Sequence, residues 1–454
     1  MSLTAEQILA LAPDASSAKA GSGLSGPAKW HATGRNAQAV WGECQGSGKD
    51  PYRTQIDLAE PAFKCSCPSR KFPCKHGIGL YLLLASNAPL FAEAAPPQWV
   101  ADWLASRQQR TEKQAEKQAE KQREKAEAPP EQAAALAAAA KKREDKRESK
   151  VAAGLAELQT WLEDLAREGL STLRGRGPAF WEAIAARMVD AQCGTLAARL
   201  RRVSGICFQT NLPDWETRLA RELAALYLLT EAARRMPALP AQLQSDVRSQ
   251  IGWNTAQEDL LAQDGVQDRW LVLAQSTRDE DRVRARSTWL RGAASGRWAL
   301  VLQYAAGTQG FDRVLAPGTG FDGELCFYPG AQPLRAVVKR QDGVAPLGPA
   351  LPPAAGLEDI LDGYASAIAA QPFLERYPVL ADAVVPRMDG GARVEWPDGR
   401  SLPLHPAFRF PWQLLGMSGG HRLAIAGEWD GHTLLPLSVF SDGRLYNFES
   451  DFAA

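Results

Sequence analysis

The spacing of hydrophobic positions changes along the chain, and in its middle third it predicts helices. Apolar side chains recur there at three- and four-residue steps, which places them on one face of a helix. Two such stripes are Leu155, Leu158, Leu162, Leu165 and Leu219, Leu223, Leu226, Leu229. Gly169 is typical of a helix end, Pro178 of a first helical position, and a further helix is expected from about Asp214 to just before Pro237. We therefore expect a helix bundle over residues 151–262.

The last part of the chain, residues 263–454, has the pattern of strands. Short apolar or alternating runs, separated by turn signals, begin at Trp270, Trp298, Leu325, Ala336 and Val394. Asp-Gly pairs at 398–399, 430–431 and 442–443 are typical of hairpin turns. With a helical insert over residues 357–370, we expect an antiparallel β-rich domain, with a meander as one arrangement.

Residues 106–150 have a charged, low-complexity sequence without an apolar stripe. Repeats of Glu-Lys-Gln-Ala and a closing run of charges favour helix but offer no face to bury. We interpret this segment as a solvated, partly helical linker that is broken at Pro129 and Pro130. Its slight excess of basic residues leaves contact with nucleic acid as an alternative role.

The candidate chemistry lies in the first part of the chain, residues 1–105. Two strand-like segments, starting at Ala39 and Tyr52, precede a cysteine-rich string, and a helical run follows it from Gly77. Within twelve residues, this string supplies three thiols and an imidazole: Cys65, Cys67, Cys74 and His76. Three sulfurs and one nitrogen form the closed tetrahedral set that structural zinc prefers. The alternative, a chance cluster of four unrelated residues, requires scarce cysteines to coincide.

These four side chains predict one structural Zn²⁺ and no metal-dependent catalysis. A catalytic zinc keeps a coordination position open for water, and four protein ligands leave none. The ion is expected to contribute directly to the free energy of folding. Cys44 lies close in sequence, and a small buried thiol is preferred there over a fifth ligand.

The order Cys-x-Cys, short loop, Cys-x-His, placed after two strands and opening a helix, resembles the SWIM zinc finger, and in detail a bacterial SWIM zinc finger family. The resemblance covers about residues 30–90 and places the family's four ligands on Cys65, Cys67, Cys74 and His76. It implies a small ββ-loop-α unit that binds DNA or protein. It also implies a MoxR-class AAA+ ATPase and a von Willebrand A-domain protein as partners, because such bacterial proteins are often encoded beside them.

Basic side chains surround the predicted metal site and allow two interpretations. Lys64, Arg70, Lys71 and Lys75 can contact phosphates. The same charges also offset a negatively charged site with three thiolates. DNA binding through this loop therefore stays open beside protein binding.

Length, charge and hydropathy limit the remaining possibilities. A chain of 454 residues predicts two to four folded units, and a formal net charge of zero gives no overall attraction to nucleic acid. The longest apolar run, near Tyr81, is far shorter than the roughly 20 residues that span a bilayer. With no leader-like start and seven mostly scattered cysteines, we expect a cytoplasmic protein without a membrane segment.

No motif in the chain predicts an enzyme. The sequence lacks a phosphate-binding loop, a Gly-x-Ser-x-Gly elbow and a His-Glu-x-x-His pair. His405, His421 and His432, with Asp430 and Asp442 nearby, leave an unrecognised site in the C-terminal domain as an alternative, but structural roles, such as that of Asp430 in its turn, are the preferred interpretation. We expect a multidomain α+β adaptor with a zinc finger, a charged helical linker, a helix bundle and a β-rich C-terminal domain.

Overall fold

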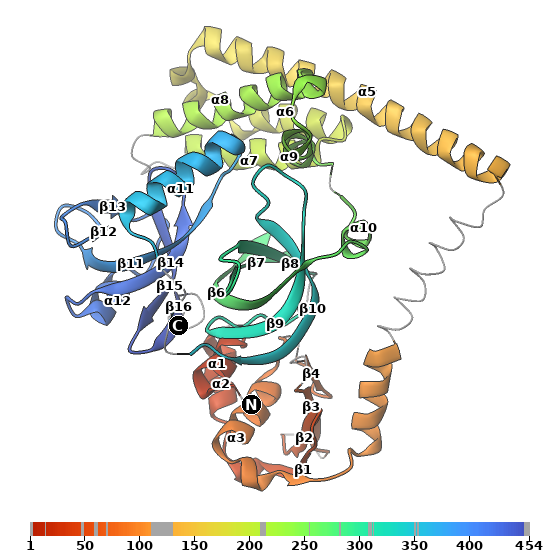
Figure 1. The fold of residues 1–454 in the computed structure, drawn as a ribbon, viewed down its shortest axis with the longest axis vertical. Helices are drawn as coiled ribbons and strands as arrows, with labels where there is room; N and C mark the ends of the chain where they lie inside the picture. The colour runs from red at the N-terminus through yellow and green to blue at the C-terminus, as the bar shows by residue number, and fades with distance from the viewer. Residues whose placement is uncertain are drawn as a thin grey trace.

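The computed structural model describes residues 3–13, 15–46, 50–58, 62–69, 71–109, 130–208, 215–253, 255–280, 283–306, 311, 313–348, 351 and 354–448. It has an α+β architecture with four parts (Figure 1). A β-barrel lies in the centre, between an N-terminal unit at the bottom of the view and a helix bundle at the top. A second large sheet lies beside the barrel on the left and carries the last strands of the chain.

The N-terminal unit is a five-stranded sheet in the order β4-β3-β2-β1-β5. Its strands are β1 (Trp30–Arg35), β2 (Ala39–Cys44), β3 (Tyr52–Asp57), β4 (Ala62–Cys65) and β5 (Ala92–Glu93). Neighbours are antiparallel, except that β5 pairs in parallel with β1. Sequence analysis predicted only β2 and β3, because β4 and β5 are very short and β1 lacks a regular alternation of buried and exposed residues.

Helices close the N-terminal unit around one core. They are α1 (Ala5–Ala10), α2 (Ala15–Ser22), the 3₁₀ turns η1 (Pro27–Lys29) and η2 (Ala88–Leu90), α3 (Lys75–Ser86) and a helical segment over residues 98–109. Every residue of α3 from His76 to Leu84 is buried. Its second glycine, Gly79, approaches α2 so closely that an added Cβ would lie 2.7 Å from Leu24 Cβ and 3.2 Å from the Gly21 carbonyl oxygen. The first helical turn of α3 is thereby held in a fixed place at the edge of the sheet.

The helix bundle confirms the predicted leucine stripes. It comprises α5 (Pro130–Glu168), η3 (Leu170–Gly175), α6 (Pro178–Asp190), α7 (Gly194–Phe208), α8 (Trp215–Arg234), η4 (Met236–Ala238) and α9 (Ala241–Ile251), followed by α10 (Gln257–Leu261). All eight stripe leucines are buried in one core with Trp181 and Met188. The start of α6 at Pro178 and the end of α5 just before Gly169 match the predicted signals. Residues 141–150 of the predicted linker extend α5 and are mostly exposed.

The central part of the chain closes into a β-barrel with strand order β10-β8-β7-β6-β9. Its strands are β6 (Val266–Glu280), β7 (Val283–Gly292), β8 (Trp298–Ala306), β9 (Thr319–Phe327) and β10 (Arg335–Pro346). The antiparallel pairs were predicted, but the closure was not. A short parallel pairing closes the barrel, with Leu300 opposite Arg335 and Val301 opposite Ala336. The meander prediction is therefore wrong here, because parallel closure depends on contacts that no local pattern encodes.

The C-terminal sheet has the order β13-β12-β11-β14-β15-β16. Its strands are β11 (Tyr377–Arg387), β12 (Arg393–Glu395), β13 (Ser401–Pro403), β14 (Leu423–Trp429), β15 (Leu434–Ser441) and β16 (Arg444–Asn447), with helices α11 (Leu357–Ala370) and α12 (Pro411–Ser418). The three Asp-Gly turns join β12 to β13, β14 to β15 and β15 to β16, as predicted. Their glycines have positive φ angles, which these tight turns require.

Side-chain contacts join the four parts. Gln7 of α1 donates a 2.6 Å hydrogen bond to the carbonyl oxygen of Gly318, at the start of β9. Asp246 of α9 accepts hydrogen bonds from Ala331 N at 2.8 Å and from Gln371 Nε2 at 2.9 Å, and burial raises its pKa.

No helix among the described residues has both the length and the apolar character needed to cross a bilayer.

Candidate metal centre

Two elements of the N-terminal unit position the four predicted ligands. Cys65 is the last residue of β4, where it lies opposite Thr54 of β3, and Cys67 follows in the loop. Cys74 caps the N-terminus of α3, and His76 is the second residue of that helix. Sequence analysis placed the first pair at a strand end and the second pair at a helix start, and both placements agree with the structure.

The four side chains converge on one point. Their ligand atoms, three sulfurs and one imidazole nitrogen, all lie within 4.8 Å of one another. Nδ1 of His76 lies 3.7 Å from Sγ of Cys65 and 3.9 Å from Sγ of Cys74. A tetrahedral zinc with Zn–S near 2.3 Å and Zn–N near 2.0 Å separates sulfur from nitrogen by about 3.5 Å. The cluster therefore fits one structural zinc ion, with Nδ1 as the histidine ligand.

The electrostatics of the cluster favour a cation at its centre. Cys74 and His76 are buried, and Cys65 and Cys67 are half-buried. Hydrogen bonds from Cys65 and Cys74 lower the pKa of Cys67 strongly. Burial acts to lower the pKa of His76, but hydrogen bonds to Cys67 and Cys74 raise it to about 9. The low pKa of Cys67 favours its thiolate form, which attracts a cation. A bound zinc ion would displace the protons that remain on the other ligands.

Neighbouring side chains on β3 support the ligands. The Thr54 hydroxyl lies 3.2 Å from Sγ of Cys65, and the Tyr52 ring lies 5.0 Å from the His76 ring between centroids. Hydrogen bonds between Arg53 and Ser66 fix the start of the metal loop. Such outer contacts orient metal ligands. Sequence analysis did not identify Tyr52 and Thr54, although their two-residue spacing places them on one face of β3.

The basic residues that were predicted around the site come from more than one element. Lys64 and Lys75 are exposed on β4 and α3, whereas Lys71 Nζ donates a 2.9 Å hydrogen bond to Ser16 Oγ of α2. Arg70 lies outside the described residues. Cys44 is fully buried on β2 and lies outside the cluster, and burial raises its pKa, as expected of a buried thiol.

Of the C-terminal histidines and acids, Asp430 and His405 take part in turn hydrogen bonds, and both line one cleft together with His432. Oδ1 of Asp430 accepts hydrogen bonds from the backbone N–H groups of His432 and Thr433, at 2.8 and 2.7 Å, which shapes the β14–β15 turn. His405 Nδ1 accepts a 3.1 Å hydrogen bond from Ala407 N, and His421 is exposed. Within the described ranges, no group of histidine, cysteine or acidic residues other than the four ligands is arranged to hold a metal ion.

Comparison with known families supports this assignment. The SWIM zinc finger matches residues 52–85, which include all four ligands. A second family, the SWIM-associated four-helix bundle domain, matches residues 146–251, from the middle of α5 to the end of α9. Curated proteins and solved structures give no match. The chain therefore contains a SWIM zinc finger and also carries the helix bundle associated with this finger.

Proposed function

We propose that this protein is an adaptor that binds protein partners and that its zinc ion has a structural role only. The observation that carries the proposal is the closed ligand set. Cys65, Cys67, Cys74 and His76 occupy all four positions of a tetrahedral ion and leave none for water or substrate. A metal that cannot take part in chemistry serves to hold a recognition surface in shape. No enzymatic activity is proposed.

Protein partners account better than DNA for the surroundings of the finger. The formal net charge of the chain is zero, so DNA binding needs a dense local patch of cations. Lys64 and Lys75 lie on different elements, and Lys71 is hydrogen-bonded to Ser16. The finger also shares its core with Ala316 of the segment before β9, which makes it part of a larger scaffold. A MoxR-class AAA+ ATPase and a von Willebrand A-domain protein are the first partners to test.

Co-purification with these two candidates tests the adaptor proposal. The full, zinc-loaded chain should retain at least one of them at both 0.1 and 0.5 M salt, because protein interfaces depend on apolar contacts as well as charge. The double variant Cys74→Ser/His76→Ala is expected to lose the interaction, and Cys44→Ala, which removes a buried thiol outside the cluster, is the matched control. Failure of the wild-type chain to retain either protein would count against the adaptor proposal.

DNA binding predicts a different result for the exposed lysines. If Lys64 and Lys75 neutralise phosphates, the double variant Lys64→Ala/Lys75→Ala should lower the slope of log K against log salt by about 0.9 for each phosphate that is no longer neutralised. Lys141→Ala/Lys142→Ala removes two exposed charges from α5 and is the control. The adaptor proposal expects weak DNA retention that is the same in both variants.

A further inference from the structure

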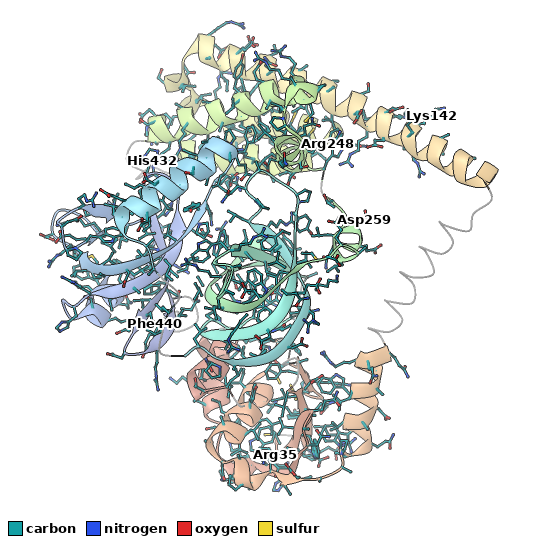
Figure 2. The ribbon with its side chains drawn as sticks, viewed as in Figure 1. Arg35, Lys142, Arg248, Asp259, His432 and Phe440 are labelled. Carbon is teal, nitrogen blue, oxygen red and sulfur yellow. The ribbon has the colours of Figure 1, made fainter. Side chains whose placement is uncertain are left out.

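A cleft of about 1240 Å³ lies between the helix bundle and the C-terminal sheet. Helices α7 and α8 form one wall, and residues 405–410 with the β14–β15 turn form the other. His432, on that turn, marks the position of the cleft where the bundle meets the sheet (Figure 2). The bundle lies above the barrel and the N-terminal unit below it (Figure 1), and none of the four metal ligands lines the cleft.

Arginine is the dominant charged residue of the cleft. Two arginines come from α7 (Arg199 and Arg202) and two from α8 (Arg218 and Arg221), and β6, the segment before β11 and residues 405–410 contribute one each. No lysine lines the cleft among the described residues. A guanidinium binds carboxylates or phosphates through two parallel hydrogen bonds, whereas lysine acts as a point charge. The composition therefore indicates recognition of planar or branched anions.

Several of these arginines already have acidic partners, and others do not. Arg199 pairs with Glu222 at 3.1 Å, and Arg202 pairs with Glu375 at 2.9 Å. In contrast, Arg218 and Arg221 form no hydrogen bond or ion pair within the part of the chain that the structure describes. Arg199 is only 5% exposed, and its Nη1 is buried without a hydrogen-bond partner among the described residues. Arg199 is therefore held within the wall, and Arg218 and Arg221 are the arginines of the two helices that a ligand in the cleft can pair with.

The positive charges of α8 face the opposite wall of the cleft. Burial lowers the pKa of His405, the carboxylates of Asp430 and Glu428 raise it, and the charges of Arg218 and Arg376 lower it. Arg218 and His405 line the cleft from its two walls. A ligand between α8 and residues 405–410 would contact both walls at once.

The apolar lining and the size of the cleft restrict the class of ligand. Phe373 and Phe408 of the lining are buried, whereas Ile206, packed against the bundle core, and Phe410 are half-buried. Pockets for small molecules usually measure about 300–1,000 Å³, so this cleft exceeds them. Four acidic side chains in the lining, Glu222, Glu375, Glu428 and Asp430, would repel the continuous phosphates of a nucleic acid. A chain with separated carboxylates and apolar side chains fits both features.

We propose that this cleft binds an extended acidic peptide segment of a protein partner. Carboxylates of the segment pair with Arg218 and Arg221, and its apolar side chains lie against Ile206 and Phe410, which are half-buried in the lining. The inference rests on the proposed adaptor function and adds a second surface, in the bundle and the C-terminal sheet, to the one that the zinc finger holds in shape.

Fluorescence polarisation with the full, zinc-loaded chain tests this assignment. The probe is a fluorescein-labelled dodecapeptide in which Glu alternates with Phe or Leu, and a lysine-for-glutamate version controls for apolar binding. Arg218→Ala/Arg221→Ala should weaken binding at least about tenfold, a loss of about 1.4 kcal/mol, because the peptide carboxylates lose two guanidinium partners. Arg234→Ala/Arg235→Ala removes the charges of the last residue of α8 and of the residue after it, outside the cleft, and should change binding less than about twofold.

Each outcome decides the proposal. Absence of peptide binding, equal binding by Arg218→Ala/Arg221→Ala, or displacement of the peptide by oligo-dT would overturn it, the last in favour of nucleic acid. Zinc content and melting temperature verify that the double variant folds. Arg409→Ala, at an exposed position of the opposite wall, provides a second test if it does not. If Arg218→Ala/Arg221→Ala retains its partner as the wild type does, the cleft is refuted as the binding surface and the adaptor function stands. If the peptide binds through these arginines but no partner is retained, the cleft stands and the adaptor function is refuted.

Discussion

The indole N–H of Trp289, on β7 of the barrel, donates a 2.9 Å hydrogen bond to Oε1 of Glu428, on β14 of the C-terminal sheet. Glu428 is only 5% exposed, and its second oxygen accepts a 2.7 Å hydrogen bond from Arg376. The buried carboxylate is therefore paired on both sides. Because Glu428 and Arg376 both line the cleft, this contact also sets the position of the cleft relative to the barrel.

Replacement of Trp289 by Phe is expected to destabilise the protein by about 1–3 kcal/mol. The change keeps an aromatic ring but leaves an oxygen of buried Glu428 without its donor, and an unsatisfied buried acceptor carries a cost of this size. Chemical denaturation followed by far-UV circular dichroism measures the effect. Trp412→Phe is the control, because Trp412 is 68% exposed and surface changes stay within about 0.5 kcal/mol. Equal stability of the two variants would contradict a structural role for the Trp289 contact.

Zinc content tests the metal centre directly. Mass spectrometry of the freshly purified, reduced wild-type chain should find about one zinc per chain, and Cys74→Ser/His76→Ala should find almost none, because two of four ligands cannot hold a structural ion. The loss should also lower the melting temperature, since zinc binding contributes to folding. Cys44→Ala should keep its zinc, and a zinc-free wild-type protein would refute the site.

The contact of α3 with α2 predicts an unusual effect of Ala in a helix. Gly79→Ala should destabilise the protein by about 1–3 kcal/mol, because the new methyl group would overlap Leu24 and crowd the Gly21 backbone. Intrinsic helix propensity alone predicts a gain of about 1 kcal/mol. Gly416→Ala is the matched control, since an added Cβ there in α12 has nothing within 4 Å. Thermal unfolding of the two variants should shift in opposite directions.

Asp430 predicts a defined dependence of stability on pH. Burial acts to raise its pKa, but hydrogen bonds from Thr433 and His432 outweigh burial and lower it. A folded pKa below the unfolded value gives stabilisation that is present above about pH 4 and is lost as pH falls through the folded value. Asp430→Ala should therefore cost about 1–3 kcal/mol at pH 7 and less at acid pH.

Denaturation of wild type and variant at each pH, compared as a difference, isolates this residue from the zinc ligands. Asp430→Asn keeps one oxygen that can accept from the turn and should recover part of the loss at pH 7, with no pH dependence of its own. A difference between wild type and Asp430→Ala that stays constant from pH 7 to pH 4 and below would contradict the role of the ionised carboxylate.

Local patterns in the sequence determined the elements and the metal ligands. The leucine stripes of α5 and α8, the helix start at Pro178 and the three Asp-Gly turns act through neighbouring residues, so sequence analysis finds them. The same holds for Cys65, Cys67, Cys74 and His76, whose ligand set spans only twelve residues. A structural zinc ion requires a compact set of thiolate and imidazole ligands, and here the sequence alone shows that set because the four residues are close together in the chain.

Tertiary structure alone decided the closure of the barrel and the formation of the cleft. The closing pair β8–β10 joins segments that each look like ordinary strands, and their parallel register depends on the whole barrel. The cleft brings Arg218 of α8 opposite His405, two residues almost two hundred positions apart in the sequence. An isolated arginine on a helix predicts only a solvated face. The fold places Arg218, without an acidic partner among the described residues, on one wall of a cleft, where it is available to an anion. Only the fold shows this, because electrostatic attraction depends on distance in space and not along the chain.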